Sequence, residues 1–159
     1  MEDVARAAGV GKGTLYRRFA DRGALAAALL DDRERRLQDH LLRGTPPLGP
    51  GAAPLVRLVA FLRALAELTE ANLDLVLASE TGRPGARYRL GAYGAWRLHV
   101  RVLAGQADPS VDAEWLADAL LAPLAADLYR HQRHELGMSA ARIAAGLEKL
   151  ARSALGTRT

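Results

Sequence analysis

Residues 2–19 read E-D-V-A-R-A-A-G-V-G-K-G-T-L-Y-R-R-F, and this stretch decides the fold because two short helical patterns meet in it at glycines. Small apolar residues share one face of the first pattern: Val4, Ala5 and Ala8. Gly9 follows at once, where a helix commonly ends in a left-handed residue. The second pattern, residues 12–19, turns Leu15 and Phe19 inward at i, i+4 spacing. The stretch therefore predicts two helices joined by a tight corner.

The outer face of the second predicted helix is polar and cationic. Its members are Lys12, Thr14, Arg17 and Arg18, with Tyr16 to one side. A helix-turn-helix with such a second helix is how many proteins enter the major groove of DNA. The stretch closely resembles the DNA-binding motif of the TetR family of bacterial transcription repressors. About 25 residues follow that pattern, including Asp3-Val4-Ala5, Ala8-Gly9-Val10, Gly13 through Phe19, Asp21-Arg22 and Ala24-Leu25.

The resemblance implies DNA contacts from the second helix and from the start of the next. The matching residues are Lys12, Gly13, Thr14, Tyr16, Arg17, Arg18 and Arg22. Hydroxyl groups and Arg22 suit phosphate oxygens, which position a protein on the duplex. Lysine and arginine on the outer face suit base edges, and Gly13 lets the backbone approach. A surface helix with solvated charges is the alternative.

Composition favours an all-α protein. Half of the 159 residues are hydrophobic, only 5% are aromatic, and no stretch alternates with a period of two. The chain has no cysteine, which fits a reducing cytoplasm, and shows neither a signal peptide nor a membrane span. The net charge of +4 suits an anionic partner such as double-stranded DNA.

Three regions are expected. Residues 1–22 form a helix-turn-helix domain that lacks the family's first helix, and 23–43 form a connecting helix. Residues 44–159 form a helical ligand-binding and dimerisation domain, which begins with the linker G-T-P-P-L-G-P-G-A-A-P. In the connecting helix, the predicted inner stripe is Leu25, Leu29, Leu30, Leu37 and Leu41. The charge run 31–36 is interpreted as a solvated face.

Further helices are expected after the linker. One begins at Pro54, a shorter one is capped by Asn72, and another covers 86–105. Asp108-Pro109 predicts the start of the next, which Pro123 should kink. Ser139 is expected to cap the last helix, whose apolar stripe is Ile143, Leu147, Leu150 and Ala154.

By the same resemblance, these helices surround a small-molecule site. The expected lining is aromatic with a few polar groups: Phe61, Leu65, Tyr88, Tyr93, Trp96, Arg97, His99 and Trp115. The alternative is that these aromatics are ordinary core. Residues 83–106 hold five arginines and no acid, which fits an anionic ligand or, more simply, a solvated basic face.

Enzyme and cofactor chemistry has little support in the sequence. The stretch 6–14 lacks the first glycine and the hydroxyl residue after Lys12 that a phosphate-binding loop needs. His131 and His134 lie i, i+3 but lack a third metal ligand, so they are read as cations at a helix end. No catalytic arrangement, cofactor or metal is expected.

The last helices offer a surface for a second copy, because small residues flank the apolar stripe: Ala140, Ala144, Ala151 and Ala154. The sequence thus predicts a TetR-type DNA-binding transcriptional regulator. We expect it to act as a homodimeric repressor relieved by an unidentified small-molecule effector. The alternative is a ligand-binding or interaction module that does not bind DNA and keeps a vestigial, truncated helix-turn-helix.

Overall fold

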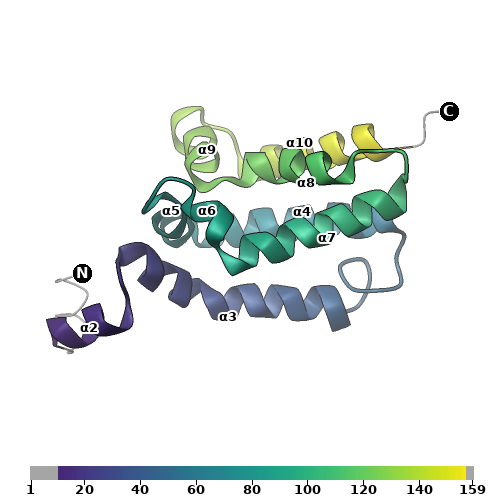
Figure 1. Cartoon of the computed structure of the whole chain (residues 1–159). Coiled ribbons are helices and arrows are strands. Elements are labelled where there is room, and N and C mark those ends of the chain that lie inside the picture. Colours follow the sequence, from purple (N-terminus) through teal and green to yellow (C-terminus); the bar gives the residue numbers. More distant parts are fainter. Residues whose placement is uncertain (1–10, 157–159) are drawn as a thin grey trace.

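The computed structural model describes residues 11–156, apart from the side chains of Lys12 and Leu15, and over that range it contains helices and no strand (Figure 1). The α-helices are α2 (Lys12–Arg18), α3 (Arg22–Arg43), α4 (Pro54–Ala71), α5 (Leu73–Thr81), α6 (Ala86–Arg89), α7 (Gly91–Ala107), α8 (Ala113–Leu121), α9 (Ala126–Arg130) and α10 (Ala140–Leu155). A 3₁₀ turn, η1 (Ala122–Leu124), and a π-helical turn, η2 (His131–Glu135), flank α9. The all-α prediction is confirmed, and the helix expected around Val4, Ala5 and Ala8 lies outside the described residues.

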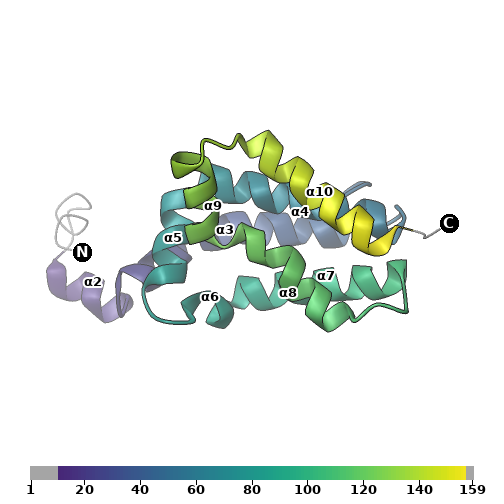
Figure 2. The same cartoon turned by 90° about the horizontal axis from the view of Figure 1, so that it is seen from above.

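The helices from α3 onward form one packed body. In Figure 1, α3 lies along one side, α4 and α7 lie in the middle, and α8 and α10 lie on the opposite side; Figure 2 shows α8 and α10 from above. Helix α4 packs against α10 and α7, α3 packs against α5, and α7 packs against α8. Fully buried side chains such as Phe61, Val100 and Leu120 fill the centre. The short helix α2 lies at one end, apart from this body (Figure 1).

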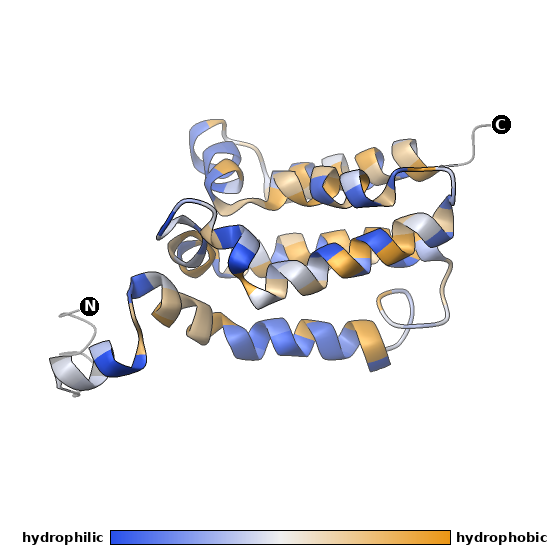
Figure 3. Cartoon of the chain, viewed as in Figure 1, coloured by the Kyte–Doolittle hydropathy of each residue, from blue (hydrophilic) through white to orange (hydrophobic). Residues whose placement is uncertain are grey.

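Helix α3 begins where the sequence predicts. Asp21 caps it, since its Oδ1 accepts a hydrogen bond of 2.8 Å from the backbone N–H of Ala24. The predicted inner stripe needs one correction: Leu29 is exposed, and Ala26 takes the buried position instead. The middle of α3 is hydrophilic (Figure 3), but the charge run is not wholly solvated, because Glu34 is partly buried.

The helix expected over 86–105 is in fact two helices. Leu90 is extended, with ψ of 133°, and separates α6 from α7. The cause lies outside the local sequence. Arg87 of α6 donates hydrogen bonds to the carbonyl oxygens of Leu121 and Leu124, at 3.0 and 3.2 Å. These bonds tie α6 to the end of α8 and so favour a direction different from that of α7.

Two predicted caps are also wrong. Asp112, not Asp108, caps α8 by accepting from the Trp115 N–H at 3.1 Å, while Asp108 ends α7 and binds Ser110 in a tight turn. Asn72 stands at the start of α5, but its side chain donates to the Leu68 carbonyl. Short polar side chains satisfy whichever backbone group lies in reach, so the position of a cap is less certain than its existence.

The carboxyl-terminal part follows the sequence more closely. Pro123 interrupts the pattern as a 3₁₀ turn, and Gly137 adopts a positive φ of 63° before the last helix. Ser139 caps α10 by accepting from the Arg142 N–H at 3.1 Å. The buried face of α10 is Ile143, Leu147, Ala151 and Leu155, whereas the predicted Leu150 is exposed. No helix in the described range is long and apolar enough to cross a bilayer.

Candidate functional site

Helix α2 presents a cationic surface at one end of the molecule. Arg17 and Arg18 are exposed in its last turn, where they also complement the helix dipole. The helix contains no acidic residue. Tyr16 is 50% exposed, Thr14 is exposed, and a Cβ added to Gly13 would meet nothing within 4 Å. This face is therefore accessible to an anionic partner as large as a macromolecule.

Arg22 extends the cationic surface onto α3. It is exposed at the first position of that helix, where the dipole disfavours a cation by roughly 0.3–1 kcal/mol. Local helix stability thus does not account for an arginine there, whereas an anion such as phosphate would be bound by both the side chain and the helix amino terminus. The described residues predicted to contact DNA consequently share one end of the molecule, while the side chain of Lys12 lies outside the description.

The start of α3 is fixed to the body. Asp21 Oδ2 accepts a bond of 2.7 Å from Arg83, and this bond and the capping bond to Ala24 lower the pKa of Asp21. Gly23 lies so close to α5 that an added Cβ would come within 3.1 Å of the Ala78 carbonyl oxygen. A movement of α5 would therefore act directly on the start of α3, next to α2.

The residues predicted to bind a ligand do not form one group. Phe61, Trp96 and His99 pack together in the core, with ring centroids of Phe61 and Trp96 at 5.6 Å and of Phe61 and His99 at 5.0 Å. Tyr88 and Trp115 are 69% and 68% exposed. Of the remaining predicted residues, Leu65 and Tyr93 line a cavity, whose wall also includes Trp96, and Arg97 lies at the surface.

The inner cavity has a volume of about 30 Å³ and lies between α3, α4, α5, α6 and α7. Its polar wall residues, which sequence reasoning missed, are Glu34, Thr69, Ser79, Glu80 and Arg87. A second, outer hollow of about 240 Å³ opens beside the start of α3 and includes Asp21, Gly82 and Arg83 in its wall. The two share Ser79 and Leu90 as wall residues and so adjoin.

A buried ion pair forms part of the inner wall. Arg87 donates to Glu80, and both side chains are nearly buried. The second oxygen of Glu80 accepts a bond of 2.8 Å from the Ala126 N–H. Burial raises the pKa of Glu80, and the charge of Arg87 opposes that rise. This pair joins α5, α6 and α9 through satisfied contacts, so it is a structural link with little capacity left for a ligand.

Glu34 differs from Glu80 because its carboxylate has no hydrogen-bond or ion-pair partner among the residues that the structure describes. Burial raises its pKa to about 7, and repulsion from Asp31 and Glu80 adds to the effect. The sequence did carry a signal: Glu34 follows Leu30 by four residues and precedes Leu37 by three, so it lies on the inward stripe of α3.

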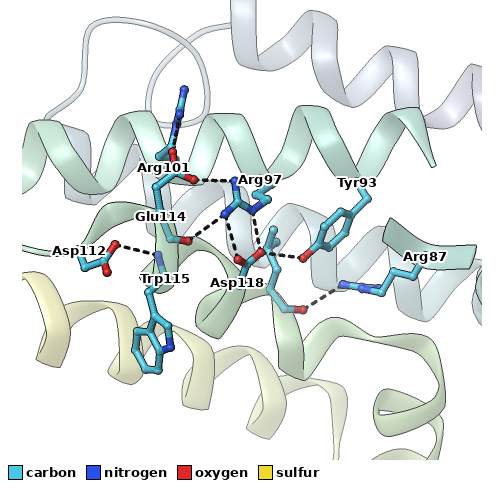
Figure 4. A network of polar contacts seen from close by, with 9 residues as sticks. Arg87, Tyr93, Arg97, Arg101, Asp112, Glu114, Trp115 and Asp118 are labelled. Carbon is cyan, nitrogen blue, oxygen red and sulfur yellow. Dashed lines mark hydrogen bonds and ion pairs between the residues drawn. The ribbon is translucent and has the colours of Figure 1, made fainter. Parts of the chain in front are cut away.

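Four of the five arginines in the basic segment 83–106 pair with acids from elsewhere in the chain, and Arg89 donates to the Pro84 carbonyl. Figure 4 shows Arg97 between Asp118 and Glu114 of α8, with N···O distances of 2.8 and 2.7 Å, and Arg101 on Glu114 at 2.5 Å. These bonds lower the pKa of Glu114 and of Asp118. Since the network is largely exposed, it contributes little stability. The ring of Trp115 points away from it (Figure 4).

His131 belongs to the π-helical turn and pairs with Glu135, its Nδ1 lying 2.8 Å from a carboxylate oxygen. His134 is exposed nearby. Within residues 11–156, no group of three or more potential ligands is placed to hold a metal ion.

An all-helical body with an exposed cationic helix at one end suits the binding of DNA. Residues 1–29 match the family model described as bacterial regulatory proteins, tetR family. No curated protein and no solved structure matches the chain.

Proposed function

We propose that the chain is a homodimeric transcriptional repressor that binds an operator through α2 and the start of α3 and releases it when a small effector binds in the body. The observation that carries this proposal is the exposed, acid-free face of α2, with Tyr16, Arg17 and Arg18 at one end of the molecule. In this proposal, Arg17 and Arg18, together with Lys12, reach base edges, while Thr14, Tyr16 and Arg22 bind phosphates.

The domain division is part of the proposal. Residues 1–22 act as the DNA-binding head, 23–43 as the connecting helix, and 44–159 as the ligand-binding and dimerisation domain. The contact of Gly23 with α5 and the Asp21–Arg83 ion pair support a coupling between body and head. An effector that shifts α5 would change the direction of α2, and with it the spacing of the two heads in a dimer.

DNA binding is tested with fragments that the wild-type chain selects from a random library. Arg17→Ala and Tyr16→Ala should each weaken binding by about tenfold, as expected for the loss of about 1–3 kcal/mol per contact. Arg43→Ala is the matched control, because it removes an exposed arginine from the far end of α3, where only a 3.8 Å contact to Asp39 is lost.

Fluorescence anisotropy at two salt concentrations measures these affinities. If the chain selects no DNA, or if the Arg17 and Arg43 variants bind equally, the DNA-binding proposal is wrong. The chain would then be a ligand-binding module with a vestigial helix-turn-helix.

A further inference from the structure

We propose that the inner cavity beside Glu34 binds the ammonium group of a small organic cation, with the apolar remainder of that ligand in the outer hollow. This inference gives the chemical class of the effector, and in that respect it rests on the proposed function.

The charges in the wall of the inner cavity favour a cationic ligand. Glu34 and Glu80 both face the inner cavity, and Arg87 is the cation in its described wall. Arg87 is already paired with Glu80 and bonded to two backbone carbonyls. Glu34 therefore has no cationic partner of its own in the described wall. A ligand that brings a positive charge would be attracted to this carboxylate, whereas an anion would be repelled by it.

The hydrogen-bonding groups of the wall also suit an ammonium group. The hydroxyl donors of the wall are used: Thr69 donates to the Leu65 carbonyl, Ser79 to the Val76 carbonyl and Tyr93 to Asp118. The acceptors that the wall still offers are the Glu34 carboxylate and hydroxyl lone pairs. A ligand group with several N–H donors matches these acceptors, and an ammonium group has that chemistry.

The size and the aromatic lining of the inner cavity fit an ammonium group. A cavity of about 30 Å³ holds a group close to the size of a water molecule, which an ammonium head resembles. Tyr93 and Trp96 line the same cavity, and aromatic faces attract cations. The adjoining outer hollow of about 240 Å³ has room for a ring. Both hollows have Leu90 as a wall residue, the extended residue that joins α6 to α7.

Calorimetry with three probes of similar shape tests the proposal: benzylammonium, benzyl alcohol and benzoate. Benzylammonium should bind and the other two should not. Glu34→Gln should weaken benzylammonium binding roughly tenfold or more, since it removes a charge-assisted hydrogen bond. Asp39→Asn is the matched control because it removes an exposed carboxylate from the same helix, and it should leave the affinity unchanged.

A measurement on the wild-type chain keeps the test decisive even if the Glu34 variant fails to fold. The ionised form of Glu34 must bind the cation, and the charged groups that act on that carboxylate are Asp31 on α3, Glu80 on α5 and, through Glu80, Arg87 on α6. Because its pKa is about 7, benzylammonium should bind roughly tenfold more weakly at pH 6 than at pH 8, with release of a proton.

Preferential binding of benzoate, equal binding by Glu34→Gln, or equal affinity at both pH values would overturn the proposal. DNA binding is measured separately. If the cation binds but does not change DNA binding, the proposed site is correct and its regulatory role is wrong. If the chain binds DNA but no cation, the cation site is wrong and the DNA-binding proposal stands.

Discussion

Glu34 and His99 are partly buried ionisable residues whose environments affect stability in opposite directions. Burial, together with repulsion from Asp31 and Glu80, raises the pKa of Glu34 from 4.5 to about 7. Burial, together with the charge of Arg57, lowers the pKa of His99 from 6.5 to about 4. The Nε2 of His99 is buried without a hydrogen-bond partner, which fits a neutral ring. The pKa shifts of Glu34 and His99 therefore both span the range between pH 4.5 and pH 6.5.

Between pH 6.5 and pH 4.5, acidification should therefore stabilise the fold through Glu34, because the native state binds its proton more readily than the unfolded chain does. It should destabilise the fold through His99, because there the unfolded chain binds the proton more readily. Each effect is at most about 1.4 kcal/mol per pH unit. Glu34→Gln should lose stability on acidification more steeply than wild type, and His99→Phe should do the reverse. Urea unfolding at three pH values measures the free energy of unfolding of wild type and of both variants. The prediction is wrong if this free energy changes with pH equally in all three proteins.

At the scale of the residue, the sequence misplaced the caps at Asp108 and Asn72 but predicted other local contacts correctly. The caps at Asp21 and Ser139 are examples, since each binds an N–H three residues away. Glu34 was misread because it sits in a charge run, although its place between Leu30 and Leu37 puts it on the inner stripe. The residues that surround Glu34 come from four other helices, so no local sequence pattern predicts that they lie near it.

Among the elements, the packing of α3 on α5 depends on a glycine. A Cβ on Gly23 would lie 3.1 Å from the Ala78 carbonyl oxygen, a backbone atom that cannot turn aside. Gly23→Ala should therefore push α3 from α5 and lower the free energy of unfolding by about 1 kcal/mol. Gly94→Ala is the control, since a Cβ there, inside α7, meets nothing within 4 Å. It should raise stability by roughly 0.4–1 kcal/mol. Equal effects of the two substitutions in thermal unfolding would argue against the close contact.

Among the helices, some features could be predicted from the sequence and others could not. Over residues 54–155, helices form where the apolar spacing predicts them, and Pro123 interrupts the pattern as expected. The break at Leu90 was missed because its cause is the bonds of Arg87 to Leu121 and Leu124, more than thirty residues away. Likewise, the arginines of α7 looked like a solvated basic face, because Glu114 and Asp118 belong to a different helix.

At the scale of the whole molecule, contact with a second copy depends on the layer opposite α3. The apolar stripe of α10, from Ile143 to Leu155, is used within the chain against α4, so a second copy would have to use what remains exposed. Trp115 of α8 and Leu150 of α10 are 68% and 44% exposed in that layer (Figures 1 and 2). Large apolar side chains on neighbouring helices indicate a contact surface.

Trp115→Arg and Leu150→Arg should consequently convert the proposed dimer to a monomer, because each would place an unpaired charge in a dry interface. Leu42→Arg is the matched control: Leu42 is 67% exposed but lies on α3, on the other side of the body. Light scattering during gel filtration at several protein concentrations measures the mass. The monomeric variants should also bind selected DNA more weakly than the control, since one head cannot span two half-sites. A dimer that survives both substitutions would show that the subunits meet through another face, and a monomeric wild-type chain would reject dimerisation altogether.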